Sequence, residues 1–364
     1  MLAIHKVQLS TASLIANTRT EGTSGNYLNM YPAHKRSYKL ILLVFCLLYL
    51  VSCSSKLFQK SSNNQTKVNH FKVVGYLNSN NLDKIDLIDL TALTHLDLAF
   101  ANPDHNGKLI FNRDQKLAEI IKKAHKAGVK VFISIAGGGI DDELASNWLS
   151  VLLPENRKFF IQELIQFVLQ NNLDGVDVDI ESNLLPTIGT LYAPFVIELK
   201  DALKSKNKGI SAALNVSDLH EAISQEALNA YDFINVMVYD KTGPWRPDDV
   251  GPHSPYSYAE EALAYWTKIR KIPAQKLTLG VPFYGYDFDK IRSVTYRELV
   301  EMDSANAYQD QFRTIYYNGI PTIIKKTQLA LKSFGGIMIW ELTQDTQDDN
   351  SLLKSIKKTI KSNS

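Results

Sequence analysis

The sequence predicts a (β/α)8 barrel over residues 71–364, in which eight parallel strands close into a cylinder and helices cover its outer face. Three observations support this prediction. Eight short apolar runs alternate with amphipathic segments, which is typical of a parallel sheet covered by helices. The 364-residue chain is 45% hydrophobic, which is enough for one large core. No GxGxxG pattern follows the first run, which argues against an open, doubly wound sheet.

Each predicted strand is a short run rich in apolar and β-branched residues and bounded by polar or turn-forming residues. In chain order the predicted strands are Lys72–Leu77, His95–Ala101, Lys130–Ile135, Gly175–Glu181, Ile210–Leu214, Phe233–Tyr239, Leu277–Tyr284 and Gly335–Trp340. Eight runs of this kind are the number that a closed barrel of this type requires.

The predicted helices have apolar residues three and four positions apart and end at Gly, Asn or a polar cluster. They are Gln115–Ala127, Glu155–Gln170, Tyr192–Lys204, Ala259–Arg270 and Pro321–Lys332. Trp148 and Trp266 fall in helical patterns, so we expect both in the core. About 50 residues separate Gly285 from Gly335, and we therefore predict loops and a helix there rather than a sizeable insertion domain.

Residues 1–52 have the pattern of a targeting segment rather than of a folded domain. A basic stretch at His34–Lys39 precedes the apolar run Leu40–Val51, which is short for a bilayer span, and Met30 is the expected natural start. Residues 50–53, with the sequence LVSC, resemble the bacterial lipobox, which implies a lipid on Cys53 and an exported lipoprotein in the outer membrane or cell envelope. The alternatives are a short transmembrane anchor and a plain cleaved signal. Residues 53–70 are polar and are expected to form a flexible tether.

The charge balance narrows the class of partner, and the cysteine content bears on disulfide bonds. Residues 1–52 hold five basic side chains and one acidic one, and the remainder has 35 basic against 37 acidic side chains. This balance argues against a nucleic-acid partner, which would require a basic surface. Cys46 and Cys53 are the only cysteines, so no disulfide is expected in the domain.

Three acids in the fourth predicted strand are the strongest functional signal. Asp177, Asp179 and Glu181 alternate with apolar residues, and this spacing places all three carboxyl groups on one face of a strand. Like charges this close cannot all remain ionised near neutral pH, so the pattern favours proton chemistry or a metal site. The other strand ends supply aromatic residues rather than His or Asn, which disfavours a divalent metal. A purely structural cluster is the third alternative.

The motif at Asp174–Glu181 matches the DGxDxDxE signature of glycoside hydrolase family 18, the chitinases and related endo-β-N-acetylglucosaminidases. Further segments resemble this family in the same chain order, namely residues 75–76, 99–101, 134–138 (SxGG), 237–240 (MxYD), 280–285 and 335–341. Ala136 stands where the first glycine of SxGG is usual. The resemblance covers residues 72–345 and implies the (β/α)8 fold.

The resemblance implies a retaining, substrate-assisted mechanism, because this family lacks a second carboxylate on the opposite face of the sugar. Glu181 would be the general acid and then the base, and Asp179 would orient the 2-acetamido group. Asp177 would share a proton with Asp179. Tyr239 would steady the acetamido oxygen, and Asp240 would face the same sugar.

The remaining predicted substrate-binding residues lie at strand ends or in the loop after the sixth strand. Trp340 would form the apolar floor under the reacting sugar. Ser134 would donate a hydrogen bond to the buried acids, and the other candidates are Tyr76, Phe100, Tyr284 and Trp245. The resemblance also implies cis peptide bonds at Ala99–Phe100 and Trp340–Glu341. No cofactor and no metal are expected.

Three functions remain open from the sequence. The first is an endo-acting, chitinase-like hydrolase of β-1,4-linked N-acetylglucosamine, working as a monomer tethered to a membrane by its N-terminal lipid. The second is an endo-β-N-acetylglucosaminidase that cuts the chitobiose core of N-glycans. The third is a non-catalytic, lectin-like sugar-binding protein, against which the intact Glu181 argues.

Overall fold

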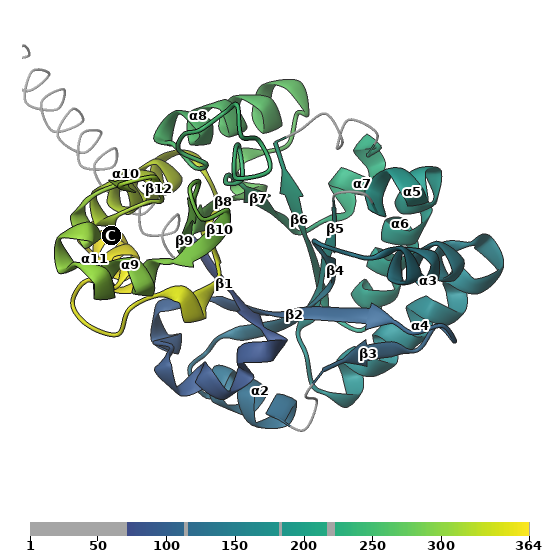
Figure 1. Ribbon diagram of the computed structural model, residues 1–364. Helices are drawn as coiled ribbons and strands as arrows, with labels where there is room; N and C mark the ends of the chain where they lie inside the picture. The colour runs from purple at the N-terminus through teal and green to yellow at the C-terminus, as the bar shows by residue number, and fades with distance from the viewer. Residues whose placement is uncertain (1–70, 113–115, 182–183, 217–222, 364) are drawn as a thin grey trace, which may run out of the picture. The chain divides into compact units, whose positions relative to one another are not determined.

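A closed barrel forms the body of the molecule (Figure 1). The computed structural model describes residues 71–112, 116–181, 184–216 and 223–363. Its main sheet runs in the order β1-β13-β8-β7-β6-β5-β4-β2-β3, and a further pairing of β1 with β2 closes it. All neighbours pair in parallel except β3, which adds an antiparallel edge to β2. The predicted (β/α)8 fold is confirmed.

The eight barrel strands coincide with the eight predicted runs, with differences of one or two residues at about half of their ends. They are β1 (Lys72–Asn78), β2 (His95–Pro103), β4 (Lys130–Gly137), β5 (Gly175–Ile180), β6 (Gly209–Asn215), β7 (Phe233–Met237), β8 (Leu277–Pro282) and β13 (Gly336–Trp340), with β3 at Leu109–Phe111. The strand register sets Ser134, Asp177 and Ser211 side by side on three neighbouring strands.

Helices surround the barrel (Figure 1). They are α2 (Leu117–Lys126), α3 (Asp142–Leu152), α4 (Pro154–Gln170), α5 (Leu184–Ile188), α6 (Tyr192–Lys204), α7 (Gln225–Ala230), α8 (Tyr256–Ala264), α9 (Tyr296–Met302), α10 (Ile320–Ser333) and α11 (Leu352–Ser362). Each of the five predicted helices has a counterpart, although α8 ends early and continues as a π-helical turn over Tyr265–Ile269. Trp148 and Trp266 are fully buried, as predicted.

A small antiparallel sheet lies between β8 and α10, where loops and a helix were predicted. It consists of β9 (Tyr284–Asp287), β10 (Arg292–Thr295), β11 (Gln311–Phe312) and β12 (Ile315–Tyr316), in the order β10-β9-β12-β11. Strands of two to four residues are too short for a recognisable alternating pattern, which explains the omission. Because β9 starts two residues after β8 ends, the small sheet stands at the barrel mouth.

The predicted targeting segment, the tether and Cys53 lie outside the described residues. Within the described ranges, no helix combines the length and apolar character needed to cross a bilayer.

A buried ammonium group connects α10 to the loop that follows β7. Lys326 is fully buried, and its Nζ donates hydrogen bonds to Ser254 O at 2.7 Å, Ser254 Oγ at 2.6 Å and Asn318 Oδ1 at 2.8 Å. Ser254 Oγ in turn donates to Val238 O just beyond β7. Burial lowers the pKa of Lys326 to about 7, because the charged form has lost its hydration.

We expect Lys326 to make stability depend on pH. Its pKa is about 7 in the folded chain and 10.5 ordinarily, so between these values the unfolded chain binds a proton that the folded chain does not. The free energy of unfolding therefore rises with pH in that window, by at most about 1.4 kcal/mol per unit. Denaturant unfolding at pH 7 and pH 9 should show this rise in the wild type and in Lys325→Met, a matched control on the exposed side of α10. An equal rise in Lys326→Met would contradict the assignment.

Candidate active site

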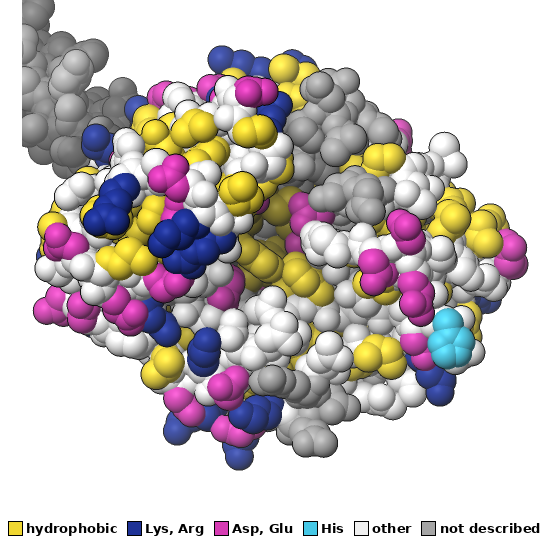
Figure 2. All heavy atoms as spheres, in the orientation of Figure 1, with side chains coloured by type: hydrophobic (Ala, Val, Ile, Leu, Met, Phe, Trp, Pro, Cys, Tyr) yellow, Lys and Arg dark blue, Asp and Glu magenta, His cyan; other side chains and the backbone are white. Residues whose placement is uncertain are grey.

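A hollow opens at the centre of the molecule where the barrel strands end, and Figure 2 shows apolar side chains inside it and acidic ones at its edge. A cavity of about 450 Å³ in this region is lined by Glu181, Met237, Tyr239 and Asp240, among others. The carboxyl ends of β5 and β7 therefore deliver the predicted acid and the MxYD motif to one space, as the fold requires of neighbouring strand ends.

Asp177 is the most strongly hydrogen-bonded of the three predicted acids. Its carboxylate accepts hydrogen bonds from Tyr76 Oη at 2.8 Å, Ser134 Oγ at 2.7 Å and Ser211 Oγ at 2.7 Å, while Asn235 Nδ2 lies at 3.4 Å. The side chain is fully buried. Burial raises the pKa of Asp177, and the surrounding donors oppose that rise because they stabilise the charged form.

Asp179 lacks comparable donors. It is 3% exposed, and its Oδ1 has no hydrogen-bond partner among the described residues. Burial raises the pKa of Asp179 well above its usual range, and the charges of Glu181, Asp177 and Asp97 raise it further. A buried carboxyl oxygen without a donor is costly, so this atom favours a ligand that brings an N–H group.

Glu181 follows the last residue of β5 and reaches the mouth. Burial raises its pKa to about 7, and the charge of Asp240 adds to that rise. The chain after β4 leaves space for this carboxyl group, since a Cβ at Gly138 would lie 2.5 Å from Glu181 Oε1. Any larger residue at position 138 would displace the acid.

The end of β4 bends sharply beside these acids. Ala136 has a φ of 77°, in the left-handed region that favours glycine, and its position corresponds to the first glycine of SxGG. Asn102 Nδ2 donates to Ala136 O at 3.2 Å and supports this conformation. A Cβ at Gly137 would approach the Phe100 ring to 2.5 Å, so glycine is needed there for close packing.

An aromatic platform forms the floor. Trp340 at the end of β13 stacks on Phe100, with ring centroids 5.6 Å apart and planes inclined by 21°, and Tyr76 lies 5.4 Å from the same indole. The peptide bonds Ala99–Phe100 and Trp340–Glu341 are both cis, as predicted. Trp340 remains partly exposed, so one part of the indole is available to a ligand.

Asp240 is held by aromatic hydroxyl groups and a histidine. Its Oδ1 accepts hydrogen bonds from Tyr284 Oη at 2.5 Å and Tyr286 Oη at 3.0 Å, and His253 Nδ1 lies 3.3 Å away. The neighbouring Tyr239 has a buried hydroxyl whose contact is the weakly accepting Met338 Sδ at 3.7 Å. That hydroxyl can therefore still donate to a ligand.

Trp245 lies farther out than the other predicted residues. It is 56% exposed and meets the Tyr286 ring edge-on at 5.0 Å. The structure thus brings the predicted site residues within the described ranges to the barrel mouth or to the interior just below it.

Several polar residues at the site were not identified from the sequence. Asp97 is fully buried in β2, with Oδ1 unpaired among the described residues and Oδ2 3.3 Å from Asn235 Nδ2. Burial and the Asp177 charge raise the pKa of Asp97 well above its usual range. Ser211, His253 and Tyr286 were also missed. The signal that could have identified Asp97 and Asn235 is a single polar residue inside an apolar run.

Within the described ranges, no three His, Cys, Asp or Glu side chains are placed to hold a metal ion.

Solved structures share this fold. A GH18 chitinase from the chitin utilization locus of Flavobacterium johnsoniae is 44% identical, with a TM-score of 0.76, over 80% of this chain and 94% of that one. A chitinase-like agglutinin from Robinia pseudoacacia is 25% identical, with a TM-score of 0.67, over 79% of this chain and 98% of that one.

Curated relatives and a family model agree with the structural comparison. A chitinase-like effector of Moniliophthora perniciosa is 27% identical over 271 residues, which is 65% of this chain and 60% of the relative. A second such effector, from Moniliophthora roreri, is matched over 53% of its length, so this chain spans little more than half of these relatives. The model for glycosyl hydrolases family 18 matches residues 72–345. With the acid motif, the barrel and this match in agreement, the chain belongs to glycosyl hydrolases family 18.

Proposed function

We propose that the protein is a chitinase-like, endo-acting hydrolase that cleaves β-1,4-linked N-acetylglucosamine with retention of configuration. The observation that carries the proposal is the bare, buried Oδ1 of Asp179 between Asp177 and Glu181. A 2-acetamido N–H would satisfy this oxygen, whereas a sugar without that group would not. The small size of the insert between β8 and α10 supports action within a chain rather than in an enclosed tunnel.

The first step requires a neutral Glu181, which a pKa of about 7 supplies in part of the molecules at neutral pH. Glu181 donates its proton to the glycosidic oxygen, and the bond from that oxygen to the anomeric carbon breaks. The carbonyl oxygen of the 2-acetamido group attacks the anomeric carbon and forms an oxazolinium ion. Asp179 accepts a hydrogen bond from the acetamido N–H and balances the positive charge of the oxazolinium ion.

The second step returns the acid to its starting state. Glu181, now a carboxylate, removes a proton from water as that water attacks the anomeric carbon. This attack opens the oxazolinium ring and restores the 2-acetamido group. Asp177 supports both steps by sharing a proton with Asp179. Its three short hydrogen bonds favour the charged form on Asp177 before the substrate binds, so the shared proton resides on Asp179; it passes to Asp177 when Asp179 accepts a hydrogen bond from the substrate's N–H.

The remaining predicted residues fit a pyranose ring at this position. Trp340 on its Phe100 support offers an apolar face to the sugar. The Tyr239 hydroxyl would donate to the acetamido oxygen, and Asp240 with Tyr284 would bind a hydroxyl group. Trp245, being exposed, would stack against a neighbouring sugar.

A non-catalytic, lectin-like role is the second candidate. The similarity to a chitinase-like agglutinin favours it, and the intact Glu181 opposes it. An endo-β-N-acetylglucosaminidase acting on N-glycan cores would use the same acids and would differ only in the residues that bind distant sugars.

We expect chitooligosaccharides to be cleaved faster than a high-mannose glycoprotein. Chromatography of the products from both substrates measures this directly. Glu181→Gln should reduce turnover by at least about a thousandfold while retaining oligosaccharide binding, because it keeps the shape of the acid but not its proton. Faster cleavage of the glycoprotein would select the endo-β-N-acetylglucosaminidase, and binding without any turnover by the wild type would select the lectin-like role.

We expect kcat/KM to fall as pH rises through about 7, because Glu181 must be protonated to act as the acid and its pKa is about 7. Asp240→Asn removes a negative charge that raises this pKa, so the alkaline limb should move to lower pH. Initial rates with a soluble oligosaccharide across pH 4 to 10 test both statements. An alkaline limb at the same pH in both proteins would refute the coupling.

We also propose that Cys53 carries a lipid and anchors an exported bacterial lipoprotein in the outer membrane or cell envelope. The support is the basic stretch, the apolar run and the LVSC sequence at residues 50–53. In cell fractionation, Cys53→Ala should move the protein from the membrane to the aqueous fraction. Cys46→Ala is the matched control and should stay with the membrane. Membrane association of Cys53→Ala equal to that of the wild type would remove this proposal.

A further inference from the structure

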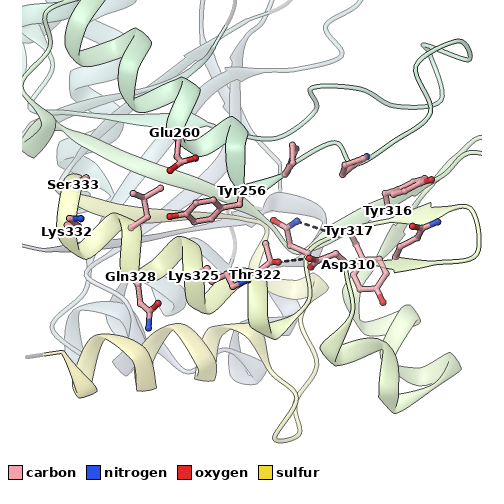
Figure 3. A pocket seen from close by; sticks show the side chains of 15 residues that line it. Tyr256, Glu260, Asp310, Tyr316, Tyr317, Thr322, Lys325, Gln328, Lys332 and Ser333 are labelled. Carbon is pink, nitrogen blue, oxygen red and sulfur yellow. Dashed lines mark hydrogen bonds between the residues drawn. The ribbon is translucent and has the colours of Figure 1, made fainter.

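A second, larger cavity lies outside the barrel mouth, between α8 and α10. It has a volume of about 920 Å³, against about 450 Å³ for the cavity at Glu181. Figure 3 shows Tyr256 and Glu260 reaching it from α8, Lys325 from α10, and Tyr316 from the small sheet. Its volume falls within the range of sites that hold a ligand larger than one sugar ring.

The chemistry of the lining favours a neutral, polyhydroxylated ligand. The acids Glu260 and Asp310 are balanced by Lys325 and Lys332, so the cavity has no net formal charge with which to attract an ion. Partly buried Tyr256 and Tyr316 offer aromatic rings, while Gln311 and Gln328 offer amide donors and acceptors. Rings for the apolar faces of sugars and amides for their hydroxyl groups are what an oligosaccharide requires.

Hydrogen bonds hold one wall of the cavity in place before any ligand binds. Asp310 Oδ1 accepts a hydrogen bond from Gly319 N at 2.9 Å, and its Oδ2 accepts one from Thr322 Oγ1 at 2.5 Å. Asn318 Nδ2 donates to Ser254 O at 2.9 Å, while its Oδ1 is held by the buried Lys326 at 2.8 Å. A ligand would therefore bind without first ordering this wall, which favours affinity.

Helix α8 lines both cavities, with Tyr256 and Glu260 in the outer one and Tyr258 and Glu261 in the one at Glu181. Tyr316 on β12 is paired in register with Tyr286 on β9, and Tyr286 Oη donates to Asp240 in the cleft. Pro252 and Pro255 line the outer cavity and flank His253, which lies 3.3 Å from Asp240. Two cavities lined by the same helix can hold neighbouring segments of one polymer.

We propose that this outer cavity is a second, non-catalytic binding site for the same N-acetylated amino-sugar polymer. The inference rests on the proposed function for the class of ligand. Tyr256 and Tyr316 contact the sugar rings, Gln328 binds hydroxyl or acetamido groups, and Pro255 with Leu329 provides apolar surface for acetamido methyl groups. A polymer held at both sites dissociates more slowly than one held in the cleft alone.

Calorimetric titration of Glu181→Gln with chitohexaose tests this inference in the absence of turnover. We expect two binding events, and adding Tyr256→Ala and Gln328→Ala should remove one of them or weaken it at least about tenfold. Tyr308→Ala is the matched control, since Tyr308 is an exposed tyrosine that does not line this cavity, and it should leave both events. Circular dichroism would establish that each variant is folded.

A single binding event that persists unchanged in the Tyr256→Ala and Gln328→Ala protein would overturn the outer site. That result leaves the proposed function intact if the wild type cleaves chitohexaose. Failure of the wild type to cleave any chitooligosaccharide would instead refute the hydrolase. Turnover by the wild type thus tests the hydrolase, and the number of binding events in the Glu181→Gln variants tests the outer site.

Discussion

The site depends on how the barrel accommodates a buried carboxylate at Asp177. Removing this group from water costs several kcal/mol unless donors replace its hydration. Hydroxyl groups of Tyr76, Ser134 and Ser211 supply three short hydrogen bonds, each of which offsets about 1.5–3 kcal/mol. The interior of β5 can therefore carry acids only because β1, β4 and β6 point hydroxyl groups at the same place.

The number of hydrogen-bond donors around the three acids falls from the barrel interior toward the mouth, and the proton affinities of the acids differ accordingly. Asp177 has a full set of partners, whereas Asp179 leaves one buried oxygen without any among the described residues. Glu181 stands at the opening with a pKa of about 7. One strand thus presents a carboxyl group with many donors, a buried carboxyl group with a bare oxygen and a carboxyl group at the opening, although the side chains differ by only one methylene.

Residues that recur along one strand were predictable, and so were residues of other strands that belong to recognisable motifs, such as Ser134, which donates to Asp177. Isolated polar residues that meet across the barrel were not predictable. The alternation of Asp177, Asp179 and Glu181 with apolar residues was enough to predict that they share one face of a strand. The eight apolar runs were enough to predict the barrel. Asp97 and Asn235 are isolated polar residues in apolar runs, and their meeting depends on barrel closure rather than on local sequence. His253 lies in a loop without a periodic pattern. The small sheet was missed because its strands have two to four residues.

The contacts around Asp177 also bear on how the chain folds. Its partner Tyr76 is 101 positions away in sequence, and Asn235 donates to that same tyrosine across 159 positions. A half-formed cylinder holding β4 to β6 would supply the two serines but would leave the carboxylate open to solvent on its remaining side. Desolvation of this carboxylate is therefore complete only when β1 is in place, which couples barrel closure to the loss of water and favours all-or-none assembly.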